Sequence, residues 1–277
     1  MLIGHEKIIE DLKRLAAKKN LAHGYIFYGP AMVGKRLAAL CFANFLETGD
    51  FAEPKLLKDA LPIAPDAKGT VGIDSIRTIK NFLWQKPNTS AYRTVIIDDA
   101  ELMTPEAQNA LLKVAEEPPH STLLILVASD IDGLAGTISS RLQKIYFPAV
   151  SRKALIDWAK QEFPDTRNLE GLVARSFGKP GLLGAMIRDQ KFWGVLESAE
   201  NLLKLKSGQR EFIKKLVEAD DFSLPKFMDA LIILLSSRDF GAKENVARWH
   251  RFLELRREIA HFNLNPRLQL ENLFTQD

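Results

Sequence analysis

A glycine-rich stretch near the start of the chain has the spacing of a phosphate-binding loop. Residues 29–36 read GPAMVGKR, which fits the pattern G-x-x-x-x-G-K through Gly29, Gly34 and Lys35. In this pattern backbone N–H groups surround the phosphates, the lysine reaches the terminal phosphates, and a Ser or Thr at the next position binds Mg²⁺. Arg36 stands at that next position. The loop therefore predicts a phosphate site that lacks its usual metal-binding hydroxyl.

The segments on either side of the loop strengthen this prediction. Residues 25–28 (YIFY) are apolar and rich in β-favouring side chains, and residues 35–46 (KRLAALCFANFL) have the composition of a largely buried helix. A glycine loop between a strand and a helix brings a helix N-terminus and several N–H groups to one point, where a phosphate can bind. The spacing alone is a weak signal, so a plain strand-to-helix turn remains an alternative.

Polar residues also follow two later runs that resemble buried strands. Thr94–Ile97 is followed by the carboxylates Asp98 and Asp99, and Thr122–Ala128 is followed by Ser129. Continuous apolar runs of this kind are typical of strands covered on both faces in a parallel sheet. We expect Asp98 to hold Mg²⁺ and Ser129 to contact a phosphate or the attacking water. A solvated strand end and an ordinary turn serine are the alternatives.

Arg141 is a further candidate for phosphate chemistry. It follows a loop that contains Gly133 and Gly136, and it precedes a third strand-like run at 142–147. An arginine at the edge of a domain can stabilise the charge of a transferred phosphate in a neighbouring subunit. It can equally form a surface salt bridge, and the spacing favours neither.

The remaining pattern predicts the fold class. Helical spacing covers residues 1–20, 73–84 and the segment from Thr104 to the prolines at 118–119, and strands alternate with helices between 25 and 147. This alternation predicts a parallel, three-layer α/β sheet. Residues 48–69, with three prolines, are interpreted as a surface connection without strand or helix. Beyond residue 148 the pattern predicts helices only.

Composition limits the class of protein. The chain has 277 residues, which suggests two or three domains, and a net charge of +3, which permits contact with nucleic acid without requiring it. A single cysteine, Cys41, excludes a disulfide framework and a cysteine-based metal site, and its apolar surroundings favour a core residue. No apolar run is long enough for a membrane span, and no signal peptide is recognised. We therefore expect a cytoplasmic protein with no membrane contact.

Several longer motifs resemble one family. They lie in the same order as in that family, and the resemblance covers the chain from residue 1 to 274. The motifs are HGYIFYGPAMVGK, VIIDDAELMTPEAQNALLKVAEEPP, SSRLQKIYF, GKPG and HFNLNPRLQLENLF. Together they resemble the bacterial replicative clamp-loader proteins of the DNA polymerase III holoenzyme, which belong to the AAA+ family. The resemblance implies an AAA+ P-loop α/β domain (1–148), a helical lid (149–203) and a helical collar that joins subunits in a ring (204–277).

The resemblance also implies a function. Such a ring opens the sliding clamp and loads it on primed DNA while its motor subunits hydrolyse ATP. The partners would be the delta and the gamma/tau-type motor subunits, with the clamp and DNA reached through the complex. The residues that match family motifs are Gly29, Gly34 and Lys35 (Walker A), Asp98 (Walker B), Ser129 (sensor 1) and Arg141 (arginine finger, with Leu142 in place of the motif's cysteine).

Four departures from the family pattern change the expected chemistry. Arg36 replaces the Mg²⁺-binding hydroxyl, Asp99 replaces the glutamate that orients the attacking water, and Gly181 stands where motor subunits carry the sensor 2 arginine. Residues 48–69 lack the four cysteines of the family's zinc module, so no zinc is expected. The expectation is a subunit that holds ATP or ADP at most without hydrolysis and lends Arg141 to the adjacent motor subunit.

Two alternative functions and one possible DNA contact stay open at this stage. An active AAA+ clamp-loader ATPase is one, although Arg36 and Gly181 argue against it. A P-loop kinase or another nucleotide enzyme is the second, and the helical tail argues against that class. A contact of Thr70 and Arg77 with the DNA backbone, at the start of the 73–84 helix, is weighed evenly against a solvated helix start.

Overall fold

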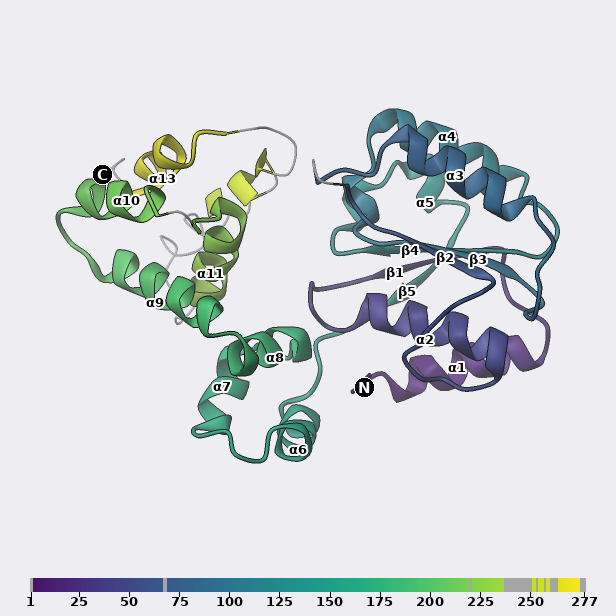
Figure 1. Ribbon diagram of the computed structural model, residues 1–277, viewed down its shortest axis with the longest axis horizontal. Helices are drawn as coiled ribbons and strands as arrows, with labels where there is room; N and C mark the ends of the chain where they lie inside the picture. Colours follow the sequence, from purple (N-terminus) through teal and green to yellow (C-terminus); the bar gives the residue numbers. More distant parts are fainter. Residues whose placement is uncertain are drawn as a thin grey trace. The chain divides into compact units, whose positions relative to one another are not determined.

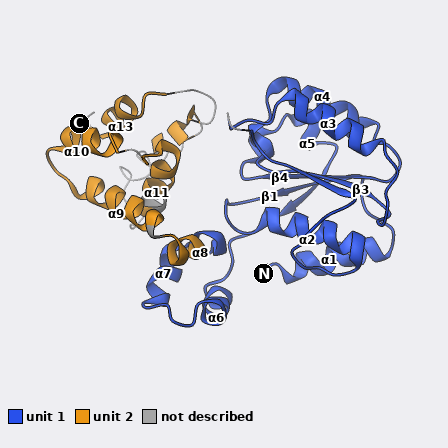
Figure 2. Ribbon diagram, viewed as in Figure 1, with its two compact units in different colours: residues 1–182 blue, residues 183–277 orange. Residues whose placement is uncertain are grey.

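The computed structural model divides the chain into two compact units, residues 1–182 and 183–277 (Figure 2). The predicted three-domain division remains a prediction, and its collar at 204–277 lies partly outside the described residues. The structure describes residues 2–66, 69–219, 221–236, 251–252, 254–256, 258–259 and 264–274.

The first unit contains a five-stranded parallel sheet in the order β2-β3-β4-β1-β5. Every residue of β3 and β4 is buried, as the continuous apolar runs in the sequence predicted. The predicted parallel α/β sheet is therefore confirmed. The strands are β1 (Gly24–Tyr28), β2 (Ala60–Ile63), β3 (Arg93–Ile97), β4 (Thr122–Ala128) and β5 (Gln143–Tyr146).

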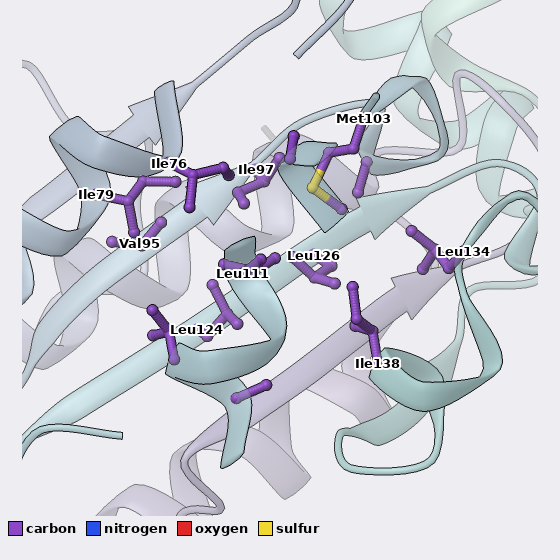
Figure 3. Close-up of a cluster of buried hydrophobic side chains, with 14 of the residues drawn as sticks. Ile76, Ile79, Val95, Ile97, Met103, Leu111, Leu124, Leu126, Leu134 and Ile138 are labelled. Carbon is purple, nitrogen blue, oxygen red and sulfur yellow. The ribbon is translucent and has the colours of Figure 1, made fainter. Parts of the chain in front are cut away.

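Helices cover both faces of this sheet (Figure 1). On one face lie α1 (Glu6–Ala17) and α2 (Lys35–Thr48), and on the other lie α3 (Ile73–Leu83), α4 (Pro105–Glu116) and the short α5 (Gly136–Ser139). Each face has its own apolar cluster. Figure 3 shows the cluster beneath α3 and α4, where side chains of both helices meet those of β3 and β4.

The strand β2 corrects the sequence interpretation of residues 48–69. Within this region Ala60–Ile63 pairs in parallel with β3 and forms one edge of the sheet. Its sequence, ALPI, contains the exposed Pro62, which has no N–H group to donate. Proline is tolerated in an edge strand because one side of that strand has no neighbour to receive the missing hydrogen bond. The prolines that suggested a loop are therefore compatible with an outer strand.

Helices alone follow the sheet in the described residues, as predicted. The first unit ends with α6 (Arg152–Glu162), α7 (Leu169–Arg175) and the start of α8 (Pro180–Arg188). In the second unit α9 (Gln190–Lys204) packs against α11 (Leu224–Ser236), and α10 (Gln209–Val217) packs against α13 (Pro266–Phe274). Among the described helices, none combines the length and the apolar character that crossing a bilayer requires.

A buried ion pair fixes the beginning of β3. Arg93 Nη1 lies 3.3 Å from Asp59 Oδ1, and both side chains are almost fully buried. The Asp59 carboxylate also accepts hydrogen bonds from the backbone and side chains of residues 88–90. All three nitrogens of the Arg93 guanidinium donate, to the carbonyls of Lys58 and Lys86. Because both charges have partners, the pair ties the α3–β3 connection to the sheet without leaving a buried charge uncompensated.

The hydrogen-bonded Asp59 carboxylate should make the free energy of unfolding depend on pH. Burial alone raises the pKa of Asp59, but hydrogen bonds from the backbone of residues 88–90 and from Thr89 lower it to about 2. The unfolded pKa is about 3.9. The carboxylate therefore contributes stability above about pH 4, and this contribution is lost as the pH falls toward 2. Asp59→Asn should lower the free energy of unfolding at pH 7 by about 3 kcal/mol, because Arg93 loses its counter-charge.

Urea unfolding at a series of pH values measures both effects. Asp74→Asn is the matched control, because Asp74 forms an exposed ion pair with Arg77 and its loss should change stability by less than about 1 kcal/mol. If Asp59→Asn kept the wild-type loss of stability between pH 4 and 2, the role assigned to this carboxylate would be wrong.

Candidate functional site

The glycine-rich loop joins β1 to α2, and its backbone requires glycine at two positions. Gly29 has φ +135°, and a Cβ there would lie 2.3 Å from the carbonyl oxygen of Phe147. Gly34 has φ +107° and precedes the first residue of α2 in the left-handed conformation. L-residues with side chains rarely adopt such angles. The two glycines that the motif identified therefore shape a tight turn at the N-terminus of a long helix, where a phosphate can bind.

The Lys35 side chain turns back into this loop. Its Nζ donates to the carbonyl oxygens of Gly29 (2.8 Å) and Pro30 (2.7 Å), and it lies 3.3 Å from Ser129 Oγ. Burial lowers the pKa of Lys35 to about 8, against the opposing effect of nearby carboxylates, of which Glu101 has the largest influence. The structure thus brings together three of the predicted residues, because β1 and β4 are neighbours and end at the same level.

Asp98, at the carboxyl end of β3, is paired with Arg36. The distance from Arg36 Nε to Asp98 Oδ2 is 3.3 Å. Burial and the adjacent Asp99 raise the pKa of Asp98, whereas the Arg36 guanidinium lowers it. The side chain that replaces the expected hydroxyl therefore neutralises the carboxylate that was expected to hold Mg²⁺. These residues fit a phosphate at the loop, whereas a Mg²⁺ ion at Asp98 would have to compete with the Arg36 guanidinium.

Sequence reasoning missed a third carboxylate beside the loop. Asp99 adopts a left-handed conformation (φ +45°) and precedes a short 3-10 turn, η1 (Ala100–Leu102), which contains Glu101. Glu101 Oε1 accepts a hydrogen bond from the Ser129 backbone N–H (2.9 Å), and its other carboxyl oxygen is buried with no hydrogen-bond partner among the described residues. Burial raises the pKa of Glu101. The run DDAE held the signal, because it places three acidic residues after one strand.

Gly181, at the sensor 2 position of the family pattern, contacts the loop through its backbone. Its N–H donates to the Met32 carbonyl oxygen at 3.0 Å. A Cβ at position 181 would lie 3.1 Å from that oxygen and 3.2 Å from the Met32 Cβ. The start of α8 therefore lies directly against the loop, and a side chain at position 181 would require the loop to shift by a few tenths of an ångström.

Arg141 lies away from the Lys35 cluster, just after α5. Its Nη1 donates to the Thr137 carbonyl oxygen (2.6 Å), and its Nη2 lies 2.6 Å from Glu116 Oε1. The Arg141 side chain keeps 37% of its surface exposed. The described contacts of this side chain therefore involve α4 and α5 rather than the loop, which agrees with a position at the domain's edge. Its action on a phosphate remains a prediction.

Thr70 and Arg77, the predicted DNA contacts, lie before and within the start of α3. The Thr70 N–H donates to Asp66 Oδ1 (3.3 Å), and Arg77 Nη1 lies 2.7 Å from Asp74 Oδ1 in an exposed ion pair. The contact with DNA remains a prediction. In the part of the chain that the structure describes, no group of three or more His, Cys, Asp or Glu residues could hold a metal ion.

The fold and the site together define a class of protein. A parallel sheet with a glycine-rich loop after β1, an acidic residue after β3 and a serine after β4, followed by helices, is the arrangement of an AAA+ P-loop protein. The profile of the family described as "DNA polymerase III, delta subunit" matches residues 4–151, and the chain belongs to this family. The expected resemblance to clamp-loader AAA+ proteins is thereby confirmed, and within them the chain resembles the delta-prime type.

Individual relatives agree with this family. The delta' subunit of DNA polymerase III from Pseudomonas aeruginosa is 31% identical over 212 residues, which are 69% of this chain and 64% of that protein. The tau subunit from Bacillus subtilis is 31% identical over 169 residues, which are 56% of this chain and 30% of that protein. The chain thus spans less than two thirds of the length of both relatives.

A solved structure resembles most of the chain. It is a gamma subunit-related protein of DNA polymerase III from Thermotoga maritima, with a TM-score of 0.57 and 26% sequence identity. The similarity covers 96% of this chain and 97% of that one. The fold class predicted from the sequence is confirmed by this likeness and by the observed sheet.

The Arg36–Asp98 pair can be tested by titration. Arg36→Ala should raise the pKa of the Asp98 carboxyl, because burial and Asp99 raise it and the guanidinium would no longer oppose them. NMR titration of protein with labelled aspartate carboxyls measures this value. Arg77→Ala, which removes only an exposed pair with Asp74, should leave the Asp98 titration unchanged. An unchanged Asp98 titration in Arg36→Ala would contradict the pairing.

Proposed function

We propose that this chain is a delta-prime-like subunit of the DNA polymerase III clamp loader that does not hydrolyse ATP itself. It would assemble with the delta and gamma/tau-type motor subunits and help load the sliding clamp on primed DNA through the complex. Membership of the delta-subunit family supports the general role. The finer assignment depends on the site.

The observation that carries the proposal is the ion pair between Arg36 and Asp98. In P-loop ATPases the metal ion bridges the phosphates and neutralises the charge that develops during transfer. A guanidinium held 3.3 Å from the metal-binding carboxylate competes with that ion for the same oxygen. Two further residues argue against hydrolysis. Asp99 is shorter than the glutamate that orients the attacking water in the family, so it would hold that water poorly. Gly181, which lies close to Met32, has no side chain to replace the sensor 2 arginine.

Arg141 supports the second half of the proposal. Its side chain is more than one third exposed and belongs to the edge of the domain, away from the chain's own loop. A guanidinium in that position can reach the ATP of an adjacent motor subunit and stabilise the transferred phosphate. The chain would then contribute to catalysis in a neighbour while its own loop binds ATP or ADP without cutting it.

One feature favours the competing function of an active ATPase subunit. Lys35 lies 3.3 Å from Ser129, so two residues of a working nucleotide site are in contact. The isolated protein should nevertheless show no more ATP hydrolysis than its Lys35→Ala variant, because the Arg36 guanidinium would compete with Mg²⁺ for Asp98. Phosphate release with ATP and Mg²⁺ measures this. Turnover that requires Lys35 would show that the competing function is correct.

The arginine finger is tested in the reconstituted loader. Arg141→Ala should lower the clamp- and DNA-stimulated ATPase of the complex. The loss should be about 10³-fold if Arg141 is the arginine finger of a single essential ATP site. It should be smaller if the other ATP sites of the complex hydrolyse ATP independently. The mass of the complex with delta and motor subunits, measured in parallel, shows whether assembly is retained. Arg14→Ala serves as the control, since it removes an exposed guanidinium of α1 that takes no part in the proposed site. Wild-type turnover in an assembled Arg141→Ala complex would refute the proposal.

A further inference from the structure

Two acceptors fix the side chain of Arg141, and one of them is the last residue of α4. Arg141 Nη1 donates to the Thr137 carbonyl oxygen, and Nη2 lies 2.6 Å from Glu116 Oε1. We propose that Glu116 is a positioning residue, whose carboxylate holds the Arg141 guanidinium in the orientation that meets the phosphate of a neighbouring subunit. This inference rests on the function proposed for Arg141.

The two contacts leave most of the guanidinium available. An arginine side chain has five N–H donors, and the Thr137 carbonyl and the Glu116 carboxylate each engage one nitrogen. The remaining donors can bind phosphate oxygens. The side chain is held at two nitrogens, so its orientation is restricted before any phosphate arrives.

The ion pair has too much solvent exposure to be a main source of stability. Arg141 and Glu116 expose 37% and 41% of their side chains. Pairs of this kind contribute little to folding because water screens them and because two flexible side chains must be ordered. An ordered arginine is more valuable to catalysis, since misplacement of a reacting group by about 1 Å can reduce a rate 10²-fold. The geometry therefore favours a positioning role over a stabilising one.

The helix α4 also contacts the start of the segment 133–141, which ends at Arg141. Gln108, in the first turns of α4, donates through Nε2 to the Gly133 carbonyl oxygen (3.2 Å) and accepts at Oε1 from the Ala135 N–H (2.7 Å). Between these ends, Leu134 and Ile138 are buried in the apolar cluster that Figure 3 shows beneath α4. The segment that carries Arg141 is thus fixed to α4 at its start, its middle and its end.

Glu117 provides a matched control. It follows Glu116 directly, is exposed, and has the same chemistry, but the ion pair of Arg141 is with Glu116. Glu117→Ala therefore removes an equal charge from almost the same place without touching Arg141. Glu116→Gln keeps an oxygen acceptor for Nη2 and removes only the charge.

The experiment measures kcat and KM for ATP in the reconstituted loader, with clamp and primed DNA present. Glu116→Ala should lower kcat about threefold to tenfold with little change in KM, because the guanidinium acts on the transition state. Glu116→Gln should recover part of the loss, and Glu117→Ala should match the wild type. The double variant Glu116→Ala/Arg141→Ala should be no slower than Arg141→Ala alone, because the two residues act as one unit.

The outcomes separate this inference from the function on which it rests. If Arg141→Ala lowers kcat and Glu116→Ala behaves like Glu117→Ala, Glu116 has no positioning role while the arginine finger stands. A higher kcat in Glu116→Ala, or a double variant much slower than Arg141→Ala, also overturns the inference. A complex that fails to assemble with both Glu116→Ala and Glu116→Gln assigns the residue a structural role instead. If Arg141→Ala has no effect, both proposals fall together.

Discussion

The parallel pairing of β1 with β4 on one side and β5 on the other is the constraint on which the site depends. In this register Tyr28, the last residue of β1, lies opposite Ala128 and Tyr146. The loop that follows β1 therefore leaves the sheet beside the ends of two other strands. One consequence is steric, because the carbonyl of Phe147 leaves no room for a side chain at Gly29. The other is chemical, because the same register brings Lys35 to Ser129.

The two cations at this edge of the sheet both have partners within the chain. Lys35 donates to loop carbonyls, and Arg36 neutralises Asp98. A phosphate bound at the loop would replace the carbonyl partners of Lys35 with negatively charged oxygens, which form stronger hydrogen bonds with an ammonium group. A metal ion would have to displace a guanidinium from a carboxylate that burial already makes harder to ionise. The residues at this edge therefore fit a phosphate better than a metal ion, and the chemistry proposed for the chain lies at Arg141.

The helix α4 connects these two parts of the molecule. It begins shortly after η1, whose Glu101 contacts Ser129, and it ends at Glu116, which contacts Arg141. Between them Gln108 bonds to the segment that precedes α5. One helix therefore connects the surroundings of Ser129 with Arg141.

Much of the fold could be predicted from the sequence because the central strands are buried on both faces. Continuous apolar runs identified β3 and β4, and the glycine spacing identified the loop before Lys35. The edge strand β2 was missed, since an outer strand needs neither a continuous apolar run nor an N–H at Pro62. Asp59 and Arg93 were missed as well, because their pairing joins segments that local patterns do not relate.

The sequence by itself determined the class of the protein and the residue types at the site, including the loss of the metal-binding hydroxyl at Arg36. Motif spacing is local, so it records which groups are present at a loop or after a strand. Only the tertiary structure decided what those groups do to one another. It placed the Arg36 guanidinium on Asp98, the Glu101 carboxylate on Ser129 and the Glu116 carboxylate on Arg141. Each of these contacts joins different elements of the fold, and their partners are set by strand order and helix packing.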